Sequence, residues 1–256
     1  MSETRGRVRA EPGHKRVRTY LAGQLVADTR RPLLVWEKPY YPTYYLPAED
    51  VVAKLVPTGE TERSPSRGEG HVHDVEVDGH RAEEAALTYP EPAIDALRDH
   101  VRIAWRAMDR WFEEDEEVFV HPRDPYKRVD ILPSSRHVVI EVEGVVVAES
   151  RRPTLLFETG LIPRTYLPPT DVRQDLLVPS DTVTRCPYKG TASYLHLRAG
   201  GVAVDDVAWT YPFPTLESVR IAGLVCFHDE KVDVIVDGER QPRPSTRFAD
   251  PSTSSS

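Results

Sequence analysis

The segment CPYKGTASY places a thiol, a phenol and an amine within four residues. Cys186 opens the segment, Tyr188 and Lys189 follow it, and Pro187 is typical of the second position of a β-turn. Because the ends of such a turn lie close together, we expect the Lys189 ammonium near the Cys186 sulfur, where a cation favours the reactive thiolate. Glu158 or Tyr188 would then donate or accept a proton, so the predicted catalytic residues are Cys186, Lys189, Glu158 and Tyr188.

Three roles for Cys186 fit the sequence: a catalytic nucleophile, a group that contacts a ligand, and a structural residue of the turn. The sequence offers no obvious histidine partner for it, since His196 comes ten residues later on a predicted strand and His228 follows a predicted helix. The other cysteine, Cys226 in IAGLVCF, is embedded in apolar residues and is predicted to belong to the core.

The elements that would position these groups come in two copies. Residues 18–51 and 139–172 align without a gap, and 14 of the 34 aligned positions are identical. Glu37 aligns with Glu158 and Tyr45 with Tyr166. A repeat of about 120 residues has the size of a domain. The predicted boundaries are a disordered N-terminus at 1–15, a first repeat at 16–126, a linker at 127–137, a second repeat at 136–240 and a disordered tail at 241–256.

Each repeat is predicted to be mainly β, with an α+β fold: a compact antiparallel domain with one helix. In the second repeat, VVIEVEG and VVVAES form a hairpin with its turn near Glu143-Gly144, and residues 231–238 alternate as a half-buried strand does. Apolar residues at spacings of three and four predict a helix over 93–112, and a shorter helix over 215–223. The acidic run at 113–117 is interpreted as a solvated helix end or loop.

The motifs GVVVAES, TYLP, CPYKGTASY and TYPFP, together with HPRDPYKRVDILPSSRH, closely resemble the bacterial domain-of-unknown-function family 427 over nearly the whole chain. The resemblance implies a compact, mostly β domain with one helix. Some catalogues attach a nucleotidyltransferase label to the family. The sequence itself contains no glycine-rich phosphate loop and no paired metal-binding aspartates after a Gly-Ser turn.

Comparison of the repeats predicts a single pocket in the second one. Residues 64–68, SPSRG, align with CPYKG at 186–190, so the proline and glycine persist while the thiol, phenol and amine occur only in the second repeat. Val72 and Leu87 stand where the second repeat has Tyr194 and Trp209. The residues predicted to line this pocket and bind a ligand are Arg151, Tyr166, Tyr194, Trp209 and Tyr211.

Two arginines follow a hairpin strand in each repeat. One of Arg151 and Arg152 is expected to point inward, where it pairs with Glu158 or clamps a carboxylate or phosphate. The aromatic stretch at 38–47 is interpreted as a contact between the two domains, or as a platform for a flat ligand.

A divalent metal is a weaker prediction. His71 and His73 lie two apart, so on a strand they share a face with Glu69. The second repeat has Ser193 and Leu195 at the positions of the two histidines, and no cofactor is expected.

Charge and composition limit the partners. The net charge is −8, shared equally by the two halves, which argues against nucleic-acid binding. No apolar run is long enough for a membrane span, and the N-terminus lacks the apolar core of a signal peptide. A cytoplasmic protein is therefore expected, with a small-molecule partner, no nucleic acid and no membrane. The duplication predicts an internal pseudo-dimer and leaves monomer and homodimer open.

The sequence favours a small-molecule-binding protein, an enzyme of unknown reaction acting on a small organic anion in the second repeat. Two alternatives stay open: a nucleotidyltransferase-like protein that handles nucleotides, and a non-enzymatic interaction or structural protein.

Overall fold

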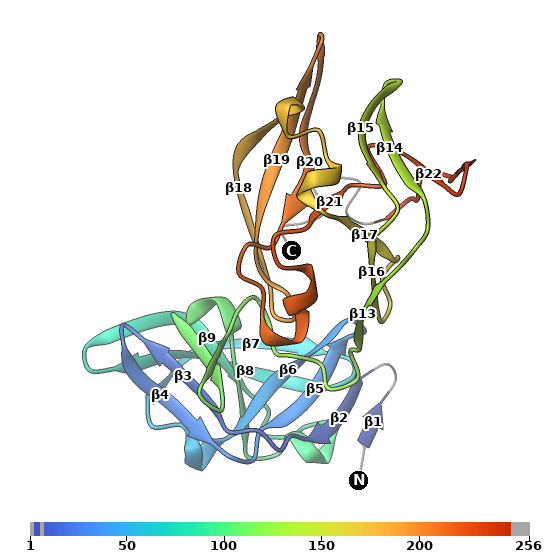
Figure 1. Cartoon of the computed structure of the whole chain (residues 1–256). Helices are drawn as coiled ribbons and strands as arrows, with labels where there is room; N and C mark the ends of the chain where they lie inside the picture. The colour runs from blue at the N-terminus through green and yellow to red at the C-terminus, as the bar shows by residue number, and fades with distance from the viewer. Residues whose placement is uncertain (1–2, 6–7, 247–256) are drawn as a thin grey trace. The chain divides into compact units, whose positions relative to one another are not determined.

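The computed structural model describes residues 3–5 and 8–246 of the chain. The chain divides into two units, Met1–Pro125 and Tyr126–Ser256, which are described separately (Figure 1). Both units consist mainly of antiparallel strands, as predicted. Within the described residues, no helix is long and apolar enough to cross a membrane.

The first unit contains an eight-stranded sheet in the order β1-β2-β5-β6-β10-β9-β8-β7 and a four-stranded sheet in the order β12-β11-β3-β4. The strands are β1 (Glu3–Arg5), β2 (Val8–Pro12), β3 (Val17–Leu21), β4 (Gln24–Thr29), β5 (Leu33–Lys38), β6 (Tyr41–Pro47), β7 (Lys54–Ser64), β8 (Gly68–Val77), β9 (His80–Thr88), β10 (His100–Ile103), β11 (Arg110–Glu113) and β12 (Glu116–Val118). Short 3-10 helices are η1 (Ala48–Asp50), η2 (Asp95–Leu97) and η3 (Trp105–Ala107).

The second unit repeats this arrangement, with a seven-stranded sheet in the order β13-β16-β17-β21-β20-β19-β18 and a four-stranded sheet in the order β15-β14-β22-β23. Its strands are β13 (Val129–Pro133), β14 (Val138–Val142), β15 (Val145–Ser150), β16 (Thr154–Glu158), β17 (Arg164–Leu167), β18 (Leu177–Cys186), β19 (Gly190–Ala199), β20 (Val202–Thr210), β21 (Val225–Phe227), β22 (Asp233–Val236) and β23 (Glu239–Arg240). The 3-10 helices are η4 (Pro169–Asp171), η5 (Gln174–Leu176) and η6 (Leu216–Ile221). The tandem duplication is thus present in the strand order itself.

The β14–β15 hairpin shows why these residues form strands. Alternate residues of β14 are buried, as its Val and Ile pattern predicts. The turn falls at Glu143 and Gly144, both with positive φ (49° and 81°), which matches the twist of a two-residue hairpin.

The two faces of the seven-stranded sheet have different neighbours. Leu167, Val207 and Phe227 pack with Val138 and Ile140 of the small sheet in one core cluster. Along these strands, the residues that alternate with Leu167, Val207 and Phe227 point to the opposite face of the sheet, which we call the site face. It carries a second cluster that includes Leu156, Tyr166, Ala192, Trp209, Tyr211, Ile221 and Cys226.

The helix predicted over 93–112 is wrong. This segment contains η2, β10, η3 and the start of β11. Asp99, at φ 58°, adopts a left-handed conformation that interrupts a helix, and Val101 and Ile103 are buried as alternate residues of a strand. The segment predicted as a helix over 215–223 contains only the 3-10 helix η6, with a non-helical Ser218 inside it.

Other boundaries also differ from the sequence prediction. The acidic run forms the β11–β12 hairpin, and Glu113 is buried because it accepts hydrogen bonds from Tyr44 Oη (2.7 Å) and Lys15 Nζ. Strand β2 lies within the predicted disordered N-terminus and β13 within the predicted linker. Residues 247–256 of the predicted tail lie outside the described residues.

The aromatic stretch at 38–47 belongs largely to the first unit's own interior. Tyr44 and Tyr45 of β6 are 4% and 0% exposed, so their rings pack inside the unit. Tyr41 stacks on His121 with ring centroids 3.8 Å apart. Neither buried tyrosine offers the open platform that a flat ligand needs.

Candidate functional site

The predicted catalytic residues Glu158, Lys189 and Cys186 come together in the second repeat. Lys189 Nζ donates to Glu158 Oε2, and the two side chains are only 12% and 6% exposed. Cys186 lies next to Lys189 and is partly exposed. Burial lowers the pKa of Lys189, but the nearby Cys186 and Glu158 outweigh burial, so the pKa rises above its usual value. Lys189 therefore stays protonated between a carboxylate and a thiol.

The turn that carries these groups is held by the segment around η6. The backbone carbonyl of Tyr188 accepts hydrogen bonds from the hydroxyls of Thr215 and Ser218, the latter at 3.0 Å. Thr215 N donates to the Lys189 carbonyl at 3.2 Å. Tyr188 is 4% exposed, so its side chain is interior and its main chain anchors the turn.

The predicted aromatic residues also meet on the site face. Strand pairing places Tyr166 opposite Cys226, Cys226 opposite Trp209, and Trp209 opposite Tyr194. Trp209 Nε1 donates to Tyr166 Oη at 3.2 Å, with the rings at 89°. Burial raises the pKa of Tyr166 and Tyr211, the latter also through nearby Cys186, so both phenols stay neutral at physiological pH.

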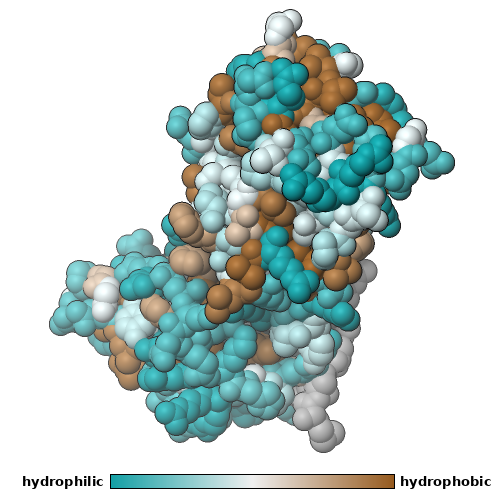
Figure 2. Space-filling view, in the orientation of Figure 1, coloured by the Kyte–Doolittle hydropathy of each residue, from teal (hydrophilic) through white to brown (hydrophobic). Residues whose placement is uncertain are grey.

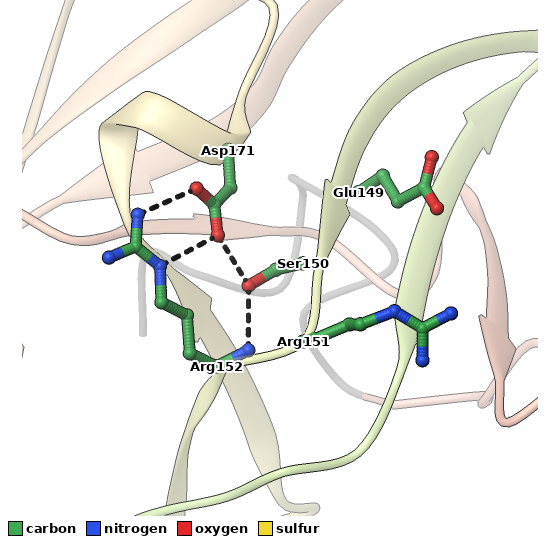
Figure 3. Close-up of a pocket in the computed structure, with 5 residues that line it drawn as sticks. All are labelled: Glu149, Ser150, Arg151, Arg152 and Asp171. Carbon is green, nitrogen blue, oxygen red and sulfur yellow. Dashed lines mark hydrogen bonds and ion pairs between the residues drawn. The ribbon is translucent and has the colours of Figure 1, made fainter.

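Arg151 does not join this group. Both Arg151 and Arg152 are exposed, and neither pairs with Glu158. A shallow hollow of about 400 Å³ is lined by Glu149, Ser150, Arg151, Arg152 and Asp171. Figure 3 shows Arg152 and Ser150 bonded to Asp171, while Arg151 and Glu149 point away from them.

The hollow contains a hydrogen-bonded motif that occurs in both repeats. Ser150 Oγ donates to Asp171 Oδ2 at 2.7 Å, and Arg152 Nη2 reaches Asp171 Oδ1 at 2.9 Å. In the first repeat, Thr29 Oγ1 donates to Asp50 Oδ2 at 2.6 Å, with Arg31 beside it. We call this motif the clasp. It ties the end of β4 or β15 to η1 or η4, which accounts for the second arginine of each repeated Arg-Arg-Pro and for the repeated Asp as structural residues.

A further group of charged residues near Trp209 was missed by the sequence analysis. Arg164 forms two hydrogen bonds with Glu230, at 2.9 and 2.7 Å, and lies 3.5 Å from Asp229. Its Cζ is 5.4 Å from the Trp209 ring centroid. The His228 ring lies 4.5 Å from the same ring. The signal was available, because Arg164 precedes Tyr166 by two residues and His228 follows Cys226 by two.

Burial acts on the pKa of the histidine and on the pKa values of the two carboxyl groups in opposite directions. Burial lowers the pKa of His228 to about 4, so the imidazole is neutral at pH 7. Burial raises the pKa of Asp229 to about 6, with Arg164 opposing it. Burial also acts to raise the pKa of Glu230, but the bonds from Arg164 and Thr246 bring it down to about 2.

The first repeat keeps an ion pair at the position of Glu158 and Lys189. Arg67 stands at the position of Lys189, and its Nη1 lies 2.8 Å from Glu37 Oε2. The amine is therefore replaced by another cation, and the expectation that the first repeat lost this polar group is corrected. The thiol and the phenol remain specific to the second repeat, since Ser64 and Ser66 align with Cys186 and Tyr188.

The histidines considered for a metal are not gathered with further ligands. His73 Nε2 bonds to Thr88 Oγ1 at 2.8 Å, and His71 is exposed. Among the residues that the structure describes, no group of three or more His, Cys, Asp and Glu side chains is placed to hold a metal ion. A divalent metal at His71 and His73 stays a prediction.

A comparison with known protein families finds one family that matches two regions of the chain. A family described as a domain of unknown function (DUF427) matches residues 9–114 and 130–238. The chain belongs to the DUF427 family. The two matched regions begin at β2 and β13, so each DUF427 repeat includes a strand that the sequence analysis left outside it. The nucleotidyltransferase label agrees with the family's identifier. No curated protein matches the chain.

Proposed function

We propose that the second DUF427 repeat binds a small organic molecule on its site face and that Cys186 reacts with it. The observation that carries the proposal is the position of Lys189 between Glu158 and Cys186. Glu158 fixes the ammonium, and the ammonium stabilises negative charge on the sulfur or on a ligand atom beside it. Tyr194, which is partly exposed, would give the ligand an aromatic surface, whereas Trp209 and Tyr211 are 7% and 6% exposed and pack behind it.

The chemistry fits a nucleophilic thiol better than a simple anion-binding site. Two cations on the site face, Lys189 and Arg164, are already paired with carboxylates, and Arg151 lies elsewhere. Anionic character of the ligand therefore stays a prediction from the sequence. In an addition of Cys186 to a carbonyl compound, the sulfur loses its proton to solvent and forms a C–S bond as the C=O π bond breaks. The negative charge on the ligand oxygen then lies beside Lys189, whose pair with Glu158 stays intact.

The test compares alkylation of Cys186 in the wild type, in Lys189→Met and in the first-repeat control Arg67→Met. We expect Lys189→Met to slow alkylation by iodoacetamide several-fold at neutral pH and Arg67→Met to leave it unchanged. Thermal-shift screening with small organic acids and carbonyl compounds should give shifts that Cys186→Ala abolishes. Unchanged alkylation in Lys189→Met, together with ligand shifts that survive Cys186→Ala, would overturn the proposal.

A second candidate is a non-enzymatic interaction protein. The segment around η6 exposes Phe213, Leu216 and Val219 by 91%, 86% and 56%. Figure 2 shows apolar residues at several places on an otherwise largely hydrophilic face. Replacement of all three by serine should leave Cys186 alkylation intact, and it should weaken partner binding only if this candidate is correct.

The nucleotidyltransferase alternative also stays a prediction. Including nucleoside triphosphates in the same thermal-shift screen tests it directly. A shift that requires a divalent cation and survives Cys186→Ala would favour this alternative over the thiol proposal.

A further inference from the structure

In the first repeat, the Glu37 carboxylate pairs with two guanidinium groups, those of Arg67 and Arg102. Arg67 Nη1 lies 2.8 Å from Glu37 Oε2, and Arg102 Nε donates to Glu37 Oε1 at 2.9 Å. Tyr45 Oη donates to the same Oε1 at 2.7 Å. Strand pairing places Arg102 where the second repeat has Cys226, so the second cation is specific to the first repeat. We call Arg67, Arg102, Glu37, Tyr45 and Tyr89 the arginine cluster.

Several hydrogen-bond donors of the arginine cluster have no acceptor among the described residues. Arg67 Nε is buried and has no hydrogen-bond partner. The two terminal nitrogens of Arg102 donate no hydrogen bond within the described residues. The Tyr89 hydroxyl is buried close to the Arg67 guanidinium, without a hydrogen bond of normal geometry. Buried donors are seldom left without an acceptor, because each costs about 1–3 kcal/mol.

The cluster keeps its positive charge although it is partly buried. Arg67 and Arg102 are 12% and 29% exposed. Burial lowers the pKa of both arginines, but Glu37 and Tyr45 outweigh burial, and both pKa values rise. One more carboxylate, Glu62, lies 3.8 Å from Arg67 Nη2, but it is 55% exposed and therefore well screened by solvent. Among the described residues, no carboxylate other than Glu37 lies within ion-pair distance of Arg102.

We propose that the arginine cluster binds a small oxoanion, the carboxylate or phosphate group of an organic molecule. The free fork of Arg102 presents two parallel donors, the geometry that suits such a group. Arg67 Nε and the Tyr89 hydroxyl supply further donors on the same face of the first repeat. This site is independent of the function proposed for Cys186, which lies in the other repeat.

The position of Tyr89 depends on a glycine. A Cβ built on Gly70 would lie 3.0 Å from Tyr89 Cε1, closer than side chains normally approach. The second repeat has Ala192 at this position. Gly70 thus lets the Tyr89 ring approach the strand closely, which fixes the hydroxyl beside Arg67.

The experiment titrates the full chain with benzoate, phenyl phosphate and the neutral analogue benzamide, and follows arginine Nε–H signals by NMR. We expect benzoate or phenyl phosphate to shift the signals of Arg67 and Arg102 at millimolar concentration, and benzamide to leave them in place. The two anions distinguish a planar carboxylate from a phosphate.

Three variants then locate the site. Arg102→Leu should weaken binding at least about tenfold, the loss of one charge-assisted pair. Arg102→Lys should restore part of it, since the charge returns without the fork. Arg106→Leu removes an exposed charge four residues away and should change little. The proposal is overturned if neither anion shifts the two arginines, if benzamide shifts them equally, or if Arg106→Leu weakens binding as much as Arg102→Leu.

Discussion

Arg67 and Lys189 occupy the same position in the two repeats, and each pairs with the equivalent glutamate of its own repeat. The pair is therefore part of the framework that both repeats share. The differences lie in its neighbours: Arg102 and Ser64 in the first repeat, and Cys226 and Cys186 in the second. The same ion pair thus supports an excess of positive charge in one repeat and a thiol in the other.

Removing one partner of the Lys189–Glu158 pair should be costly. Lys189→Met leaves the Glu158 carboxylate, 6% exposed, without its cation, and we expect a loss of about 3 kcal/mol in the free energy of unfolding. Lys54→Met, which removes a lysine that is 73% exposed, should cost less than about 1 kcal/mol. Urea denaturation compares them. Equal losses in the two variants would show that the pair is not buried in solution.

The two cysteines should differ in reactivity. Cys186 is partly exposed and Cys226 is 0% exposed. Mass spectrometry after treatment with a maleimide should therefore find one labelled thiol in the native chain and two in denaturant. Native labelling of Cys226 would contradict the packing of β21 between β17 and β20.

His228 and Asp229 should change the free energy of unfolding with pH in opposite directions. The pKa of His228 falls to about 4 on folding, so the unfolded chain binds more protons at this residue between about pH 4 and 6.5, and stability rises with pH there. The pKa of Asp229 rises to about 6, so the folded chain binds more protons between about pH 4 and 6, and stability falls with pH there. The two effects nearly cancel in the wild type.

A substitution at either residue removes its own effect and leaves the pH dependence of the other. Asp229→Asn should make stability rise by about 2–3 kcal/mol from pH 4 to 6.5, and His228→Gln should make it fall by a similar amount from pH 4 to 6. Denaturation midpoints measured at the ends of these ranges provide the readout. Slopes of the same sign in the two variants would contradict the assignment.

The clasp should contribute equally to both repeats. Ser150→Ala removes the hydroxyl that donates to Asp171, and Thr29→Ala does the same for Asp50, so each should cost about 1–2 kcal/mol. Ser135→Ala, at an exposed site, is the control. A loss in only one repeat, measured by denaturation, would show that the clasp is not a shared structural element.

The strands were predictable because alternation and turn residues are local signals. The β14–β15 hairpin and its turn at Glu143-Gly144 are confirmed. The helix over 93–112 was wrong because apolar residues on successive short strands reproduce helical spacing by chance. The left-handed Asp99 and the alternate burial of Val101 and Ile103 show that the segment contains a strand.

The candidate site was predictable only in part. The β-turn brought Lys189 to Cys186, and the duplication pointed to Glu158. Arg151 was misplaced because it follows the last residue of β15, where strand alternation no longer fixes direction. Local spacing related Arg164 to Tyr166 and His228 to Cys226, but that the two meet at one place depends on β17 pairing with β21, which are far apart in the sequence.

The edge strand β13 decides where the chain can be divided. It pairs along its length with β16, yet it precedes the segment in which the two repeats resemble each other most. If the gene is split at codon 137, the carboxyl-terminal half lacks β13 and exposes the unpaired edge of β16, which favours aggregation. A split between codons 125 and 126 keeps every strand of each sheet on one polypeptide, and the halves expressed from it should be soluble alone.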